Sequence, residues 1–115
     1  MLNRVESIRR GMEVLACSLA LISPSSATAT ELTAGYVALE MAPDARFPFI
    51  SGIVEGIAQV RVRSDDGETE MTGCIYHWFY EEEKSYDIIL AAFAKFQDRA
   101  PGAVVDALIR RRCGA

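Results

Sequence analysis

Residues 74–113, which read CIYHWFYEEEKSYDIILAAFAKFQDRAPGAVVDALIRRRC, decide the fold of this chain. A cysteine stands at each end of the stretch, and two segments with helical spacing of apolar residues lie inside it. We expect a disulfide between Cys74 and Cys113. The rest of the domain is then expected to pack against the unit that this bond closes.

Apolar residues recur at steps of three and four along most of the chain, which predicts an all-α fold, a small bundle of four to five helices. The predicted helices cover residues 31–41, 44–62, 71–80 and 85–96, with a last one from Pro101 to about Cys113. Pro101 is typical of a first helical residue, and Pro48 is expected in the first turn of the second helix. Ser85 is expected to act as the N-cap of the fourth helix.

Gly52 and Gly56 lie four residues apart inside the second predicted helix. Each glycine in a helix interior costs about 1 kcal/mol relative to alanine, so we expect another helix to approach this face closely. The aromatic residues Tyr76, Trp78 and Tyr80 follow the first bridge cysteine. We expect both groups in the core, with a dimer surface as the alternative.

The first 29 residues have the features of a secretory signal peptide. An arginine-containing segment comes first, an apolar run follows at 14–22, and Ala27-Thr28-Ala29 supplies small residues for cleavage near Ala29. Cleavage there would leave residues 30–115 as a single helical domain. It would also remove Cys17, three basic and two acidic residues, so that Cys74 and Cys113 remain and the net charge changes from −4 to −5.

The composition and the motifs argue against several function classes. The net charge of −4 gives no basic field for a nucleic acid, and no apolar run has the 18 to 20 residues (about one bilayer span) of a membrane helix. His77 is the only histidine, and a bridged Cys74 would offer it no thiolate. Cys-x2-His also lacks the further ligands of a zinc site. We therefore expect neither catalysis nor a metal or other cofactor.

Two acidic loops are candidate surfaces for a partner. The first contains Asp65, Asp66 and Glu68, and the second contains Glu81, Glu82 and Glu83. Both follow predicted helices and are rich in polar and turn-forming residues. A partner with a cationic cleft would suit them, and plain solvated connectors are the alternative.

Three segments carry a family resemblance: FPFISGIVEGIAQVR (47–61), GCIY (73–76) and AAFAKFQDRAPGAVVDALIRRRC (91–113). Over about residues 47–113 the chain resembles the type VI secretion amidase-immunity (Tai) family. The resemblance implies a small exported helical protein of the periplasm, which binds a peptidoglycan amidase and blocks its active site. The chain departs from the family in the segment IYHWFYEEE after Cys74, and no binding residue carries over.

The small size and single bridge also resemble the periplasmic acid-stress chaperones HdeA and HdeB. Such proteins loosen at low pH, when carboxylates become protonated, and expose apolar surface. The leading expectation is a non-catalytic, periplasmic protein-binding domain of the immunity type. An acid-stress chaperone is the alternative.

Overall fold

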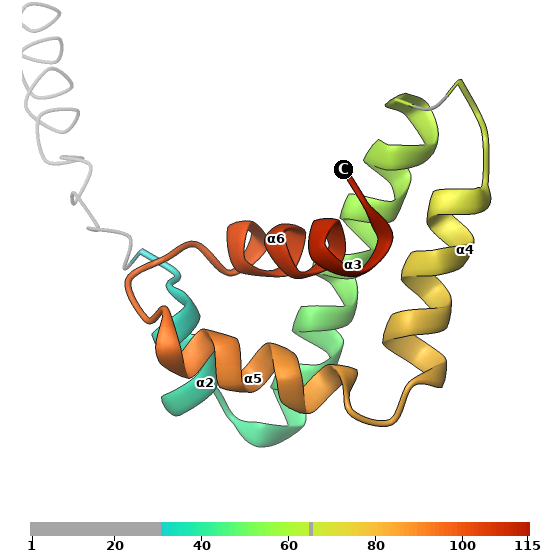
Figure 1. Ribbon diagram of the computed structural model, residues 1–115. Helices are drawn as coiled ribbons and strands as arrows, with labels where there is room; N and C mark the ends of the chain where they lie inside the picture. The colour runs from blue at the N-terminus through green and yellow to red at the C-terminus, as the bar shows by residue number, and fades with distance from the viewer. Residues whose placement is uncertain (1–30, 65) are drawn as a thin grey trace, which may run out of the picture. The chain divides into compact units, whose positions relative to one another are not determined.

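The computed structural model describes residues 31–64 and 66–115, and Glu31–Ala115 form one compact unit. Five α-helices and one π-helical turn follow in the order α2 (Ala34–Leu39), α3 (Pro43–Ser64), α4 (Glu70–Tyr76), η1 (His77–Glu81), α5 (Ser85–Lys95) and α6 (Pro101–Cys113) (Figure 1). No strand occurs in these ranges, so the predicted all-α fold is confirmed. The predicted signal peptide (1–29), with Cys17, and the acidic loop residue Asp65 lie outside the described residues.

The helices form two hairpins that share one core (Figure 1). α3 and α4 lie side by side in the first hairpin, and α5 and α6 form the second. α6 also contacts α3 and α4, while α2 packs against α5. The predicted bridge is present: Cys74 in α4 is bonded to Cys113 at the end of α6, with their Cα atoms 5.9 Å apart.

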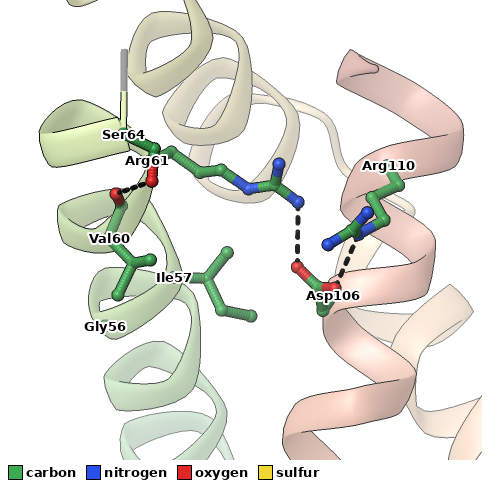
Figure 2. A pocket seen from close by; sticks show the side chains of 7 residues that line it. All are labelled: Gly56, Ile57, Val60, Arg61, Ser64, Asp106 and Arg110. Carbon is green, nitrogen blue, oxygen red and sulfur yellow. Dashed lines mark hydrogen bonds and ion pairs between the residues drawn. The ribbon is translucent and has the colours of Figure 1, made fainter. Parts of the chain in front are cut away.

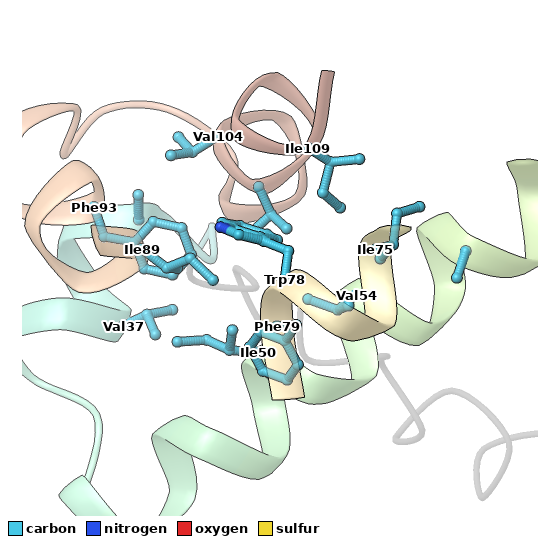
Figure 3. Close-up of a cluster of buried hydrophobic side chains, with 13 residues drawn as sticks. Val37, Ile50, Val54, Ile75, Trp78, Phe79, Ile89, Phe93, Val104 and Ile109 are labelled. Carbon is cyan, nitrogen blue, oxygen red and sulfur yellow. The ribbon is translucent and has the colours of Figure 1, made fainter. Parts of the chain in front are cut away.

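Every helix contributes to a cluster of thirteen buried hydrophobic side chains (Figure 3). On α3 the buried positions are Ile50, Val54 and Ala58, which recur every four residues and so lie on one face. The apolar residues at steps of three and four along 44–62 predict a broader buried stripe, from Phe47 to Val60. Phe47 and Val60 are in fact 47% and 61% exposed and do not belong to the core.

The start of α3 differs from the prediction. The helix begins at Pro43, so that Pro48 is its sixth residue. Pro48 was expected in the first turn of the helix, but it lies beyond that turn. A proline there cannot donate to the carbonyl of Asp44, four residues earlier. Both Pro48 and Asp44 are exposed, and water can therefore replace the missing partner.

The π-helical turn η1 changes which aromatic side chains of the third predicted helix face inward. The backbone N–H of Glu82 donates to the carbonyl of His77, five residues back, at 3.2 Å. Trp78 and Phe79 are both buried, whereas Tyr80 is 48% exposed. The helix is confirmed, and the prediction that Tyr80 belongs to the core is wrong.

Ser85 serves the end of η1 and not the start of α5. It is the first residue of α5 and is 1% exposed. Its hydroxyl lies 3.0 Å from the carbonyl oxygen of Phe79 and 2.9 Å from that of Glu82. The prediction of Ser85 as an N-cap is therefore wrong, because Lys84 is at the N-cap position and the Ser85 hydroxyl donates to the two carbonyls at the end of η1.

A close approach of another segment occurs at Gly35 of α2, which lies against Gln97 in the turn after α5, and not at the glycines of α3. Within the described residues, a Cβ at Gly52 or Gly56 would meet nothing within 4 Å, and both glycines are exposed. The predicted helix packing on that face is wrong. At Gly35, by contrast, a Cβ would lie 2.8 Å from Cβ of Gln97, and the Gly35 N–H donates to the Gln97 carbonyl at 3.0 Å.

These environments predict opposite results for the same substitution. Gly35→Ala should lower the free energy of unfolding by about 1–3 kcal/mol, because the methyl group overlaps with Gln97. Gly52→Ala should raise it by about 0.5–1 kcal/mol, because the helix gains propensity at no steric cost. Urea unfolding of both variants measures the difference. A destabilised Gly52→Ala protein would contradict the open environment of that glycine.

Candidate functional site

The disulfide removes Cys74 from any chemistry with His77. While the bond is intact Cys74 has no thiolate, and a nucleophile requires one. The His77 ring is 61% exposed, and its Nδ1 lies 2.9 Å from Oε2 of Glu81. The side chain that His77 contacts is therefore a surface carboxylate four residues later in the chain.

The two predicted acidic loops lie at opposite ends of the α4–η1 segment. Asp66 and Glu68 are exposed in the turn before α4, and Glu81–Glu83 are at the end of η1. The twelve residues of α4 and η1 separate the loops by about 18 Å at 1.5 Å per residue. They do not form one cluster of charge.

Within the second loop, the three glutamates have different surroundings. Glu82 is paired with Arg112 of α6, and Glu81 is bonded to His77. Glu83 is exposed and takes part in none of the ion pairs among the described residues. Glu83 therefore remains open to a partner, and Glu81 is held only by an exposed histidine, whereas Glu82 holds α6 against this loop.

A row of aromatic rings covers the surface between α3, the α4–η1 segment and the start of α5, where a surface position for Tyr76 and Tyr80 was only the alternative prediction. Phe47 stacks on Phe79 with ring centroids 5.7 Å apart and meets the edge of Tyr86 at 5.6 Å. Tyr80 meets Phe79 edge-on at 4.8 Å and lies 6.0 Å from Tyr76. Phe79 is buried beneath the others. We call the remaining four residues the aromatic surface: Phe47, Tyr76, Tyr80 and Tyr86.

Glu55 of α3 holds two of these rings in place. The hydroxyls of Tyr76 and Tyr80 each donate to one oxygen of the Glu55 carboxylate at 2.8 Å. This bond to Glu55, with burial, raises the pKa of Tyr76 above its ordinary value. At Tyr80, a bond with Ser51 lowers the pKa, while Glu55 and burial raise it, and the net direction is upward.

Replacing Glu55 with its neutral isostere should therefore change the tyrosine titration. In Glu55→Gln the pKa of Tyr76 and of Tyr80 should fall toward the ordinary value, as measured from the ultraviolet absorbance of tyrosinate during alkaline titration. In the wild-type protein the raised pKa values stabilise the fold below pH about 10, and this contribution is lost as the pH rises through them. Glu68→Gln, in an exposed turn, is the control and should leave the titration unchanged. Identical curves for all three proteins would rule out the proposed tyrosine–carboxylate pairing.

The exposed glycines of α3 lie beside the aromatic surface. Phe47, Ser51 and Glu55 follow one another at steps of four on α3, and Gly52 and Gly56 form the next row outward. Because neither glycine has a Cβ and no atom of the described part of the chain lies within 4 Å of where it would be, the helix backbone is open there. Another molecule can approach this face more closely than it could approach an ordinary helix.

A second polar cluster joins α3 to α6 (Figure 2). The Asp106 carboxylate accepts from Arg61 at 3.1 Å and from Arg110 at 2.8 Å, beside a hollow of about 280 Å³. Burial raises the pKa of Asp106, but the hydrogen bonds from Arg110 and Arg61 lower it by more, and the net direction is downward. The cluster is an ion-paired tie between helices.

In the described part of the chain, no group of three or more histidine, cysteine or acidic side chains is placed to hold a metal ion. Nor is any helix of this part long and apolar enough to cross a membrane. Comparison of the chain with protein-family models, with curated proteins and with solved structures found no match.

Proposed function

We propose that this chain is an exported, non-catalytic protein-binding domain of the immunity type, and that the aromatic surface contacts its partner. The observation that carries the proposal is the exposure of Phe47 and Tyr80, which are 47% and 48% exposed although both pack on Phe79. Large aromatic side chains at a surface are enriched in protein interfaces, where they bury much apolar area.

The rings are also arranged before a partner arrives. Two of them are fixed by Glu55, so that binding costs little side-chain entropy. The open backbone at Gly52 and Gly56 lets a partner approach the same side of α3. This arrangement supports the proposal that a few side chains of the aromatic surface supply most of the binding free energy.

Acidic side chains adjoin the aromatic surface and suit a cationic partner surface. Glu81 follows Tyr80 directly in the chain, and Glu83 is exposed two residues later. Charges at the rim of an interface steer association and select partners more than they add affinity. Together with the family resemblance, this favours a peptidoglycan amidase as the partner, with its active-site cleft covered by the aromatic surface.

Export to the periplasm is part of the proposal. The Cys74–Cys113 bond supports it, because disulfides persist in oxidising compartments. The signal-like residues 1–29, with cleavage near Ala29, would direct the chain there.

Inhibition of a peptidoglycan amidase from the same organism tests the proposed function. The oxidised protein should bind the amidase and stop its cell-wall hydrolysis. Tyr80→Ala should weaken binding about tenfold or more, as expected of an aromatic residue at an interface centre. Binding is measured by titration calorimetry and inhibition by the release of cell-wall peptides.

Val60→Ala is the matched control, since Val60 is an exposed apolar residue of α3 that lies outside the aromatic surface. It should bind like the wild-type protein. If the wild-type protein neither binds nor inhibits any amidase of the organism, the amidase proposal is wrong. If Tyr80→Ala and Val60→Ala have equal effects, the aromatic surface is not the contact face.

The Asp106 cluster favours the acid-stress chaperone as a second candidate function. It joins α3 to α6 through one carboxylate whose pKa is lowered by two arginines. Acid would neutralise that carboxylate and release both arginines. At pH of about 2–3, a chaperone of this type should expose dye-accessible apolar surface and suppress the aggregation of a client protein. A protein that does neither at this pH is not such a chaperone.

Stability below neutral pH should depend on Asp106. Because the pKa of Asp106 is lower in the folded than in the unfolded state, its contribution is present above about pH 4 and is lost as the pH falls through the folded-state value. Asp106→Asn should therefore lose less of its remaining stability than the wild-type protein between neutral and strongly acidic pH. Urea midpoints across this range measure the effect, with the exposed turn variant Asp66→Asn as control. Parallel curves would contradict the assignment.

A further inference from the structure

An apolar groove runs between α5 and α6, away from the residues of the aromatic surface. It encloses about 410 Å³. Its lining includes Phe96, Arg99, Ala103, Ala107, Leu108 and Arg111. Leu108 and Arg111 also line an adjoining hollow of about 330 Å³ beside Trp78 and Ile88. The two hollows are therefore neighbours along α6, with Leu108 and Arg111 common to both.

The shape of the groove suits a helix. Its floor on α6 includes Ala103 and Ala107, both exposed and one turn apart, so that short side chains leave room above them. Phe96, which is 45% exposed, stands at its α5 side, and Ile88, which is 46% exposed, stands beside the adjoining hollow. An apolar ridge of another helix can fill such a groove between two helices.

The charges at the groove are all positive, in a chain whose net charge is −4. Arg99 lies just before α6 and Arg111 in its last turn, and the Lys95 ammonium lies 5.5 Å from the centre of the Phe96 ring. Among the residues that the structure describes, no acidic side chain lines the groove. Within the described ranges, the ion pairs engage Arg61, Arg110 and Arg112, and neither Arg99 nor Arg111 takes part in one.

We propose that this groove binds an amphipathic helix of a partner protein, with acidic residues of that helix paired with Arg99 and Arg111. The stretch of α6 from Pro101 to Arg111 is about 15 Å long at 1.5 Å per residue. The two carboxylates of the partner helix would therefore stand about ten or eleven residues apart, with apolar residues facing the groove between them. A single-headed lipid would need a cation at one end only, and the two cationic ends favour a helix.

The site is independent of the amidase proposal, since none of the residues that line it belongs to the aromatic surface and its charges have the opposite sign. Its test is the titration of the oxidised protein with a labelled amphipathic helical peptide of about fourteen residues, which carries leucines on one face and a glutamate near each end. A matched peptide carries lysine in place of both glutamates. The glutamate peptide should bind about tenfold more tightly than the lysine peptide.

Charge reversal in the protein should exchange this preference. The Arg99→Glu and Arg111→Glu double variant should bind the lysine peptide better, whereas Arg63→Glu, an exposed arginine of α3 outside the groove, should leave the preference unchanged. Ala107→Trp, which fills the groove from an exposed position, should abolish binding of both peptides.

Three results would overturn the proposal. The first is equal affinity of the glutamate and lysine peptides for the wild-type protein. The second is binding to phosphatidylglycerol vesicles, lost in the double variant, without binding to the glutamate peptide. The third is a dimer in sedimentation experiments that Ala107→Trp dissociates, because the groove would then hold a second copy of the chain.

Discussion

Removal of the Cys74–Cys113 disulfide is expected to lower the free energy of unfolding by about 4 kcal/mol. The bond joins residues 39 positions apart, and without it the unfolded chain regains the conformational freedom of that loop. A domain of this size has a total stability of about 5–10 kcal/mol, so the loss is a large share of it. Urea unfolding with and without reductant measures the loss, and Cys74→Ala/Cys113→Ala should reproduce it.

Thiol titration provides the control for this prediction. A chain that begins at Thr30 contains only these two cysteines, and it should show no free thiol until it is reduced. Two titratable thiols in protein recovered from an oxidising compartment would contradict the bond. An unchanged urea midpoint after complete reduction would show that the hairpins hold together without it.

Much of the fold could be predicted because it depends on local patterns. α5 and α6 were placed within a residue or two of their observed ends, since Pro101 marks a helix start and the apolar steps continue on both sides of the turn. The bridge followed from the cysteine count once the first 29 residues were set aside. Such signals are contained in neighbouring residues and need no tertiary contact.

The errors arose where tertiary contact decides the role of a residue. A glycine looks the same in sequence whether it lies against a neighbour, as Gly35 does at Gln97, or faces open space, as Gly52 does. Ser85 looked like an N-cap because serine is common at that position, yet a nearby helix end provided its acceptors. These choices depend on distant segments.

The aromatic surface was missed for a related reason. The sequence shows a cluster of aromatics after Cys74, but regular helical spacing does not tell which of them is exposed once a π-helical turn shifts their phase. It also gives no sign that Glu55, more than twenty residues earlier, meets Tyr76 and Tyr80. The exposed glycines beside Glu55 were the available signal. Their cost to the helix predicts packing inside the domain as readily as an open face, so it does not reveal the surface by itself.

Phe93→Ala is expected to lower the free energy of unfolding by about 3–5 kcal/mol. Phe93 of α5 is fully buried in the shared core, among side chains from both hairpins and from α2 (Figure 3). Truncation removes apolar area from the interior and leaves a cavity that close-packed neighbours cannot fill. Urea or thermal unfolding of the oxidised protein measures the change.

The same substitution three residues later provides the control. Phe96 ends the same helical segment but is 45% exposed, so Phe96→Ala should cost only about 1 kcal/mol or less. Both variants should keep the disulfide, so that the difference between them reports burial and not the bridge. If the two variants lost equal stability, the core would not be centred on α5. The hairpins would then depend on the Cys74–Cys113 bond and the Asp106 ion pairs more than on shared packing.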